Sequence, residues 1–205
     1  MLSNSLSKKE LTSLYLAGHS MSGIAEILKC SIHKVVYWMD KYGIKRRTRS
    51  EAVYLKLNPN GDPFKIKESL NIRETFLYGL GLGIYWGEGD KRSLHSVRVA
   101  NTDPAILRTF IKFLSTICRI ESRKLSYAIV CFNDSNPVKS RKYWAKELSI
   151  FPAKFGKIVQ IPPQGRGKYK RKSQFGVCTV SVGNIKLKAW IMKEIDKIRE
   201  QAGIA

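Results

Sequence analysis

The chain has 205 residues, which is long enough for one or two domains with buried cores. Its 37 lysine and arginine residues outnumber its 16 aspartate and glutamate residues, and the formal net charge of +21 indicates a polyanionic partner, nucleic acid ahead of an anionic membrane. The alternative that composition leaves open is a ribosomal-type or merely soluble basic protein.

The cysteines and histidines do not form a metal-binding pattern. The four cysteines are widely spaced without a C-x-x-C pair, and the three histidines do not complete a zinc motif. The N-terminus has no signal region, and no stretch is long enough to span a membrane. We therefore expect an intracellular protein of the cytoplasm or nucleoid, with free thiols, no membrane association and no small-molecule cofactor.

Residues 8–45 have the apolar spacing of three short helices. Ser31 is placed to cap the third helix, and the arrangement resembles the helix-turn-helix of resolvases and invertases. In such units the residues just after the cap meet base edges of DNA. The candidates for this contact are His33, Lys34 and Tyr37. The alternative is a small helical bundle that binds protein.

A basic tail and a connecting segment follow this domain, which we place at residues 1–50. Short arginine arms beside such units enter the minor groove of DNA, and an equally good interpretation is a solvated linker that touches only phosphates. The arginines concerned are Arg46, Arg47 and Arg49. Prolines and an Asn-Gly step within residues 51–70 argue against a continued helix and predict a linker between two domains.

The stretch from Phe76 to Lys91 is apolar for about three helical turns and ends on an acidic turn that contains glycine. Gly79, Gly83 and Gly87 recur every fourth residue and therefore share one face of a helix. Each interior glycine costs about 1 kcal/mol relative to alanine, and the compensating gain that we expect is a second helix packed closely against this face. The stretch is too short for a membrane span, which takes about 20 apolar residues.

The rest of the chain alternates strands and helices and predicts an α+β domain over residues 71–205. Helices are expected after the capping residues Asp103, Asn136 and Asn184. Strands are expected where the pattern favours extended structure, at residues 94–100, 125–132, 157–161 and 175–182.

The end of the glycine-rich stretch resembles the LAGLIDADG motif of homing endonucleases. Gly83 takes the position of the inner glycine and Gly87 that of the second small residue. Glu88 takes the position of the metal-binding acid, and Gly89 that of the closing glycine.

Three positions, Gly81, Tyr85 and Trp86, depart from the letters of the motif, and its acid is a glutamate, one methylene longer than the usual aspartate. The resemblance implies an α+β domain with the αββαββα endonuclease-like fold, preceded by the small all-α helix-turn-helix domain. One additional helix, near residues 137–149, is expected beyond the family's element order.

A single copy of the motif implies a homodimer in which the faces of Gly79, Gly83 and Gly87 are in contact. Glu88 of each chain, with the backbone carbonyl of Gly87, would bind Mg²⁺ or Mn²⁺, and the dimer would cut double-stranded DNA across the minor groove, leaving short 3′ overhangs. Two-fold symmetry implies a long, nearly palindromic target. A lysine usually assists in this family, and the candidates are Lys91, Lys168 and Lys170.

The densest basic run, residues 162–172, is a further candidate for DNA contact. If it is extended, four side chains point to one face. They are Arg166, Lys168, Lys170 and Lys172. The family binds DNA on a saddle of antiparallel strands, to which Arg98, Lys124 and Ser126 would belong. The alternative is a basic loop that contacts phosphates without sequence preference.

Three functions fit these features: a metal-dependent homing endonuclease, a catalytically inactive DNA-binding transcription regulator, and an RNA-binding maturase. The acid at Glu88 favours the endonuclease, because a regulator has little need of a carboxylate facing phosphate. Asp90 has two interpretations, a cap for the turn after Gly89 or a second metal ligand, and the capping role is the better supported.

Overall fold

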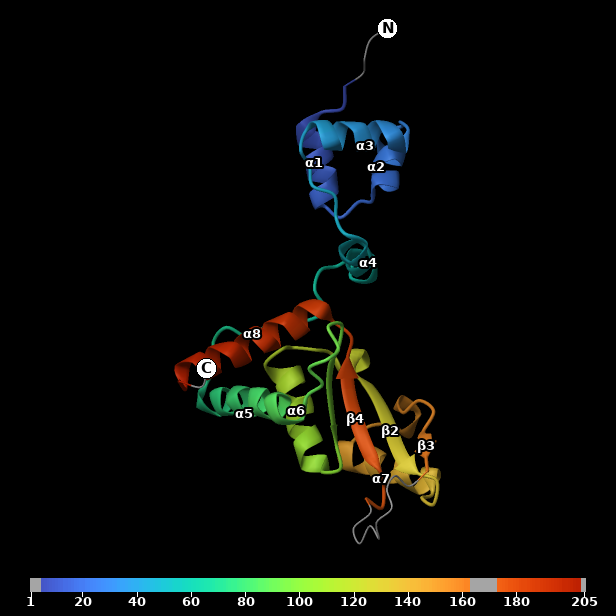
Figure 1. Cartoon of the computed structure of the whole chain (residues 1–205), viewed down its shortest axis with the longest axis vertical. Coiled ribbons are helices and arrows are strands. Elements are labelled where there is room, and N and C mark those ends of the chain that lie inside the picture. The colour runs from blue at the N-terminus through green and yellow to red at the C-terminus, as the bar shows by residue number, and fades with distance from the viewer. Residues whose placement is uncertain (1–4, 163–172, 204–205) are drawn as a thin grey trace. The chain divides into compact units, whose positions relative to one another are not determined.

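The computed structural model describes residues 5–162 and 173–203, and the chain forms two units, Met1–Pro63 and Phe64–Ala205 (Figure 1). The expected division was a first domain of residues 1–50 and a linker of residues 51–70. The first unit is therefore longer than expected, because it includes part of the predicted linker.

The N-terminal unit contains three short helices around a small apolar core. They are α1 (Lys8–Leu16), α2 (Met21–Ile27) and α3 (Ile32–Lys41). The side-chain oxygens of Ser20 and Ser31 accept hydrogen bonds from the backbone N–H groups of Gly23 and Lys34, so each serine caps the helix that follows it. The core consists of Leu11, Tyr15, Ile24, Ala25, Val35 and Met39.

A fourth helix, α4 (Arg49–Leu57), occupies much of the segment that we expected to be a linker. Thr48 and Glu51 form a capping box, in which each residue's side chain accepts from the other's backbone N–H. The helix ends at Asn58, directly before Pro59, so the proline and the Asn-Gly step stop a helix that the capping box had started. The sequence analysis did not predict this helix, because it gave weight only to the stop signals.

The C-terminal unit is built on one mixed four-stranded sheet with the order β1-β4-β2-β3. The central strand β4 is antiparallel to both β1 and β2, whereas β3 is parallel to β2. The strands are β1 (Val97–Asn101), β2 (Ser126–Phe132), β3 (Val159–Ile161) and β4 (Val177–Val182). The helices are α5 (Ile72–Glu88), α6 (Pro104–Thr116), α7 (Pro137–Leu148) and α8 (Ile185–Gln201), with short 3₁₀ turns η1 (Ser122–Lys124) and η2 (Pro152–Lys154).

This architecture confirms the predicted α+β class, and a strand lies in each of the four predicted segments. It departs from the expected element order at one point: among the described residues a single strand, β1, separates α5 from α6, where αββαββα has two. The chain after α5 turns sharply and makes only an isolated bridge, Gly89 to Val99, before β1 begins. The sheet is also not a purely antiparallel saddle, because β3 runs parallel to its neighbour.

Helix α5 packs against α6 through a close approach at Gly81. A Cβ atom added to Gly81 would lie 2.2 Å from Cγ of Phe113 in α6, so a side chain here cannot fit without displacing the ring. Phe113 itself is fully buried and stacks on Phe110, which in turn stacks on Tyr85 of α5. Gly81, one of the departures from the family motif, is therefore the glycine that fixes α5 in this chain.

We expect Gly81→Ala to lower the free energy of unfolding by about 1–3 kcal/mol, because the new methyl group overpacks the contact with Phe113. The matched control is Gly79→Ala, where a Cβ meets nothing within 4 Å and alanine should stabilise the helix by up to about 1 kcal/mol. Chemical denaturation followed by circular dichroism measures both. Equal stability of the two variants would contradict this account of the contact.

Candidate active site and nucleic-acid interface

One face of α5 is not covered by any of the residues that the structure describes. The side chains of Ile72 and Phe76 are 88% and 72% exposed, and Leu80 is also exposed. The three glycines predicted to line a helix contact lie along the same side of α5, are exposed, and a Cβ added to any of them would meet nothing within 4 Å. They are Gly79, Gly83 and Gly87. The structure thus separates the glycines of α5 by role, since Gly81 packs against Phe113 and the predicted stripe packs on no described residue.

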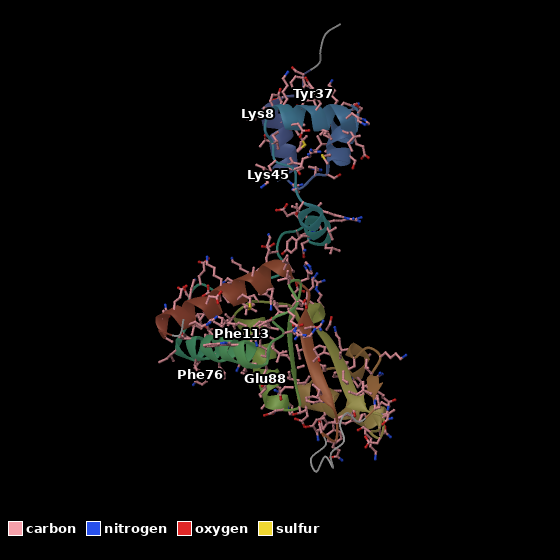
Figure 2. The ribbon with its side chains drawn as sticks, in the orientation of Figure 1. Lys8, Tyr37, Lys45, Phe76, Glu88 and Phe113 are labelled. Atoms are coloured by element: carbon pink, nitrogen blue, oxygen red, sulfur yellow. The ribbon has the colours of Figure 1, made fainter. Side chains whose placement is uncertain are left out.

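Figure 2 shows Phe76 and Glu88 toward opposite ends of α5. At the beginning of the helix, Asn71 and Glu74 form a capping box, and Glu74 also accepts a hydrogen bond from the Lys67 ammonium at 2.5 Å. The Lys67 hydrogen bond, followed by that from the Asn71 backbone, lowers the pKa of Glu74. This start of the helix is consequently well anchored.

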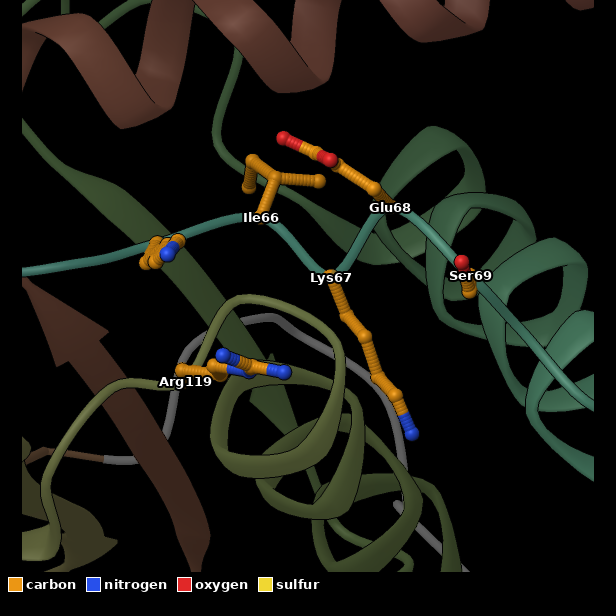
Figure 3. Close-up of a pocket in the computed structure, with 6 residues that line it drawn as sticks. Ile66, Lys67, Glu68, Ser69 and Arg119 are labelled. Carbon is orange, nitrogen blue, oxygen red and sulfur yellow. The ribbon is translucent and has the colours of Figure 1, made fainter.

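A hollow of about 220 Å³ lies beside this anchored start and is shown in Figure 3. The chain segment that lines it is fixed by two backbone hydrogen bonds, in which the N–H groups of Lys65 and Lys67 donate to the carbonyls of Cys118 and Ile117. The side chains of Lys67 and Arg119 extend to one side of the chain segment and Glu68 to the other (Figure 3). Since α5 has 17 residues, the hollow lies about 24 Å along the helix from Glu88 and takes no part in a site there.

Glu88 is the last residue of α5, and its exposed carboxylate makes no hydrogen bond or ion pair with a described residue. The neighbouring carbonyl of Gly87 accepts a long hydrogen bond from Nζ of Lys91, at 3.4 Å. The structure therefore brings three of the predicted site residues together at the end of the uncovered face: the acid, the carbonyl proposed to share its metal, and one candidate lysine.

Asp90 caps the turn that follows. Its Oδ1 accepts hydrogen bonds from the backbone N–H groups of Arg92 and Ser93, at 2.9 and 3.3 Å, and Nη1 of Arg98 lies 3.9 Å from its Oδ2. The backbone donors of Ser93 and Arg92 are the main reason that the pKa of Asp90 is lowered. The geometry is that of the capping role, and it commits the carboxylate to its own turn.

A buried lysine that the sequence analysis missed, Lys188, is hydrogen-bonded to the backbone of this turn. Lys188 of α8 is 4% exposed, and its Nζ donates to the hydroxyl of Tyr85 at 2.5 Å and to the backbone oxygen of Asp90 at 2.6 Å. The Tyr85 hydroxyl donates to the same Asp90 oxygen at 2.7 Å. Burial raises the pKa of Tyr85 to about 12 and lowers the pKa of Lys188.

The signal for Lys188 was present in the sequence, since it lies one residue after the inward-facing Leu187 and between helical positions that are buried. A lysine at such a position is rarely buried without a polar partner. Its partners, a tyrosine and a backbone carbonyl from distant segments, could not be identified from the pattern.

We expect Tyr85→Phe to lower the free energy of unfolding by about 1–3 kcal/mol, because the Lys188 ammonium then keeps only one of its two acceptors in a buried position. Tyr127→Phe is the matched control, because this buried tyrosine donates no hydrogen bond within the described chain. Denaturant titration should give a loss within about 0.5 kcal/mol for the control. A similar loss of unfolding free energy in both variants would mean that the hydrogen bond between Tyr85 and Lys188 adds no stability beyond that of an ordinary tyrosine hydroxyl.

The face of the sheet opposite the helices is open and carries small polar side chains. Arg98 and Ser126 lie in one row across the sheet, because Ser181 of β4 pairs with both. In the next row, Thr179 pairs with Ala100 and Ala128. The structure thereby joins two of the predicted contact residues and adds two that were missed, Ser181 and Thr179. Alternation along the predicted strand at 175–182 could have identified them.

Lys124 and the basic run stand apart from this row. Lys124 is the exposed last residue of η1, before β2 begins. The predicted contact residues of the basic run lie outside the described residues, so DNA contact or catalytic assistance by them stays a prediction. They are Arg166, Lys168, Lys170 and Lys172.

In the N-terminal unit, the three predicted base-contacting residues follow the Ser31 cap at the beginning of α3. His33 is exposed, Tyr37 is 58% exposed (labelled in Figure 2), and Lys34 is half-buried. Lys41, which the sequence analysis did not single out, extends over the rings of Tyr37 and Trp38. Exposed cationic and aromatic side chains therefore share α3.

The arginines expected to form an arm are engaged within their own unit. The Arg47 backbone N–H donates to the Tyr15 hydroxyl at 2.6 Å, its guanidinium carbon lies 3.9 Å from the centre of the Tyr15 ring, and Nη1 donates to the His19 carbonyl. Arg46 pairs with Asp40 at 3.5 Å, and Arg49 is the first residue of α4. Arg47 would have to break its contacts with Tyr15 and His19 before it could enter a DNA groove. Arg46 and Arg49 are already exposed.

Within residues 5–162 and 173–203, no three His, Cys, Asp or Glu side chains come together in a way that could hold a metal ion. The donors at the end of α5 are oxygens, which suit Mg²⁺, and this ion is typically held by one or two carboxylates together with phosphate and water. Glu88 and the Gly87 carbonyl fit that pattern if a second carboxylate is supplied by another chain.

No helix in the described part of the chain is both long and apolar enough to cross a lipid bilayer. Comparison of the chain with family models, curated proteins and solved structures gave no match.

Proposed function

We propose that this chain is a homodimeric, metal-dependent endonuclease of the LAGLIDADG type that cuts double-stranded DNA at a long, nearly palindromic site. The observation that carries the proposal is the uncovered glycine face of α5, which ends on the exposed and unpartnered carboxylate of Glu88. A face of this kind is explained by a second copy of the same helix.

Packing two copies of α5 about a two-fold axis would bury the exposed side chains of Ile72, Phe76 and Leu80, which otherwise face water. Glycines without neighbouring atoms allow two helix backbones to approach more closely than larger residues do. If the two-fold axis runs along the helices, the two Glu88 carboxylates would lie at adjacent helix ends, and the pair would supply the second acid that one chain lacks.

Glu88 and the Gly87 carbonyl are the groups that would hold Mg²⁺ or Mn²⁺. When bound, the ion would activate water and stabilise the leaving oxygen of the phosphodiester. The chain's own residues set the position of these ligands: the Lys188 and Tyr85 hydrogen bonds hold the turn that ends α5. Lys91, already next to the Gly87 carbonyl, is placed to interact with a phosphate oxygen brought to this end of the helix.

DNA binding is proposed on two elements. The open face of the sheet carries Arg98 beside the small side chains of Ser181 and Ser126. Because these serine side chains are short, the strands could approach the base edges in a DNA groove. The helix-turn-helix unit would read the flanks of the site through α3.

A second candidate is a DNA-binding transcription regulator that has lost cleavage. It is favoured by the helix-turn-helix unit and by the presence of only one carboxylate per chain at the end of α5 within the described residues. The two candidates share the dimer and the DNA surfaces, and they differ only in what Glu88 does.

We expect Glu88→Gln to lower Mg²⁺-dependent cutting by at least about 100-fold while leaving DNA affinity unchanged, because the amide keeps the shape of the side chain but loses its charge. The substrate is a randomised duplex library from which cut ends and bound fragments are both sequenced. Glu68→Gln, at another exposed glutamate of the same unit, is the control. A bound motif without cut ends for the unaltered protein would favour the regulator, and cutting by Glu88→Gln would refute the site.

We expect Gly83→Val to weaken the dimer by about 2 kcal/mol or more, roughly 30-fold in the dissociation constant, because a branched side chain would separate the two helices. Gly183→Val is the matched control, since a Cβ at either position meets nothing within 4 Å in the chain. Sedimentation velocity over a concentration series measures the equilibrium. If the Gly83 variant dimerises like the control, the glycine face is not the interface.

A further inference from the structure

The outer face of α7 carries a row of lysines that the proposed endonuclease site does not use. Lys139, Lys142 and Lys146 are all exposed and follow one another at intervals of three and four residues, so they lie along one side of the helix over about 10 Å. Ser140, Trp144 and Leu148 are buried on the opposite side. The row is thus directed away from the core, on the helix side of the sheet rather than on its open face.

Few acidic residues lie near this row in the sequence. Asp134 precedes the helix, and Glu147 is the only acid between residues 135 and 193, with its carboxylate bound to Arg108 at 2.8 Å. Among the described residues, Lys139, Lys142 and Lys146 make no ion pair or hydrogen bond. Like charges at such spacing destabilise a helix by about 0.2–0.5 kcal/mol per pair, a cost that an external polyanion would remove.

A neighbouring segment carries two more lysines. Nη2 of Arg141 donates to the carbonyl of Gly156 at 3.2 Å, which holds the segment after η2 against α7. Lys154 is the last residue of η2 and Lys157 follows Gly156, and both are exposed and without a partner among the described residues. Arg141 is on the core side of α7, so these two lysines are not part of the row; Figure 1 shows α7 against the sheet near β2 and β4.

Helix α8 provides the contrast. Two of its exposed lysines, Lys193 and Lys197, are also four residues apart, but each has an acid three residues away, and Lys197 is bound to Glu194 at 2.7 Å. The exposed side of α8 thus has the mixed charge that is typical of a helix face in contact with solvent. The face of α7 has charge of one sign only, which is the arrangement found where a protein contacts a phosphate backbone.

We propose that the lysine face of α7 (Lys139, Lys142 and Lys146) is a second DNA-binding surface that contacts the phosphates of duplex DNA without reading its sequence. It goes beyond the proposed endonuclease site, because it lies on the other side of the sheet from Arg98 and Ser126 and needs neither metal nor dimer. A duplex on the open face leaves α7 free, so this surface binds a separate stretch of DNA.

The test compares Lys142→Gln/Lys146→Gln with Lys193→Gln/Lys197→Gln, two pairs with equal spacing and equal loss of charge. Glutamine is a good helix former, so both variants should fold. Binding to a labelled duplex of random sequence is measured by fluorescence anisotropy over a salt series, in EDTA so that cleavage cannot contribute. Two lost phosphate contacts lower the slope of log K against log salt by about 1.8, and lower the affinity by up to about 30-fold at roughly 0.15 M salt.

The α7 pair is expected to show this loss and the α8 pair to stay near the unaltered protein. Equal losses in both, or none in either, would overturn the proposal, because net charge alone would then explain the result. A loss for anionic vesicles without a loss for DNA would assign the face to membrane lipid instead, and would also overturn it. Failure of the endonuclease proposal is separate, since it would appear only as missing metal-dependent cutting.

Discussion

The absence of a side chain at Gly81 is the constraint on which the C-terminal unit depends. Because the Phe113 ring occupies the space of a Cβ, α5 lies directly on α6 and its rotation about its own axis is set. Leu77, Leu82 and Tyr85 then face the core, and Gly79, Gly83 and Gly87 necessarily face outward. The same contact that stabilises the unit therefore leaves an apolar helix face without a partner, and any function of this protein has to account for that face.

The end of α5 is held by a different kind of interaction. A buried ammonium, a tyrosine hydroxyl and a backbone carbonyl form a closed set of hydrogen bonds among Lys188, Tyr85 and Asp90. Burying a lysine is costly, and here the ammonium donates to the Tyr85 hydroxyl in α5 and to the Asp90 backbone oxygen in the turn that follows Glu88. With Asp90 also capping that turn, the backbone around Glu88 is rigid, while the carboxylate itself projects unpartnered. Rigid backbone and a free acid are what a metal-binding position requires.

Positive charge is distributed over more than one surface of the protein. Part of it is neutralised locally, as where Arg46 pairs with Asp40 or Arg108 with Glu147. Arg47 is instead placed on the Tyr15 ring, so a residue that looks like part of a basic tail stabilises the first unit. Among the described residues, exposed cationic side chains lie on the open sheet face, on α3 and on α7. A chain of net charge +21 is thus organised into separate cationic surfaces rather than being uniformly basic.

Local patterns in the sequence determined much of this architecture. Helix caps at Ser31, Asp103, Asn136 and Asn184 and strand patterns placed helices and strands to within a few residues, because these signals act over one or two turns of chain. The glycine spacing predicted that Gly79, Gly83 and Gly87 share one side of α5, as they do, and the capping box at Thr48 would have revealed α4 had it been weighed against the stop signals that follow.

Only the tertiary structure decided the rest, because it depends on contacts between distant segments. The parallel pairing of β3, the choice of Gly81 as the packing glycine, and the burial of Lys188 beneath a turn about a hundred residues away have no local signature. Strand register joined Arg98 to Ser126 through Ser181, and the fold of the first unit placed Arg47 against Tyr15. Sequence periodicity tells which side of an element is apolar, but what that side meets is determined only when the elements pack.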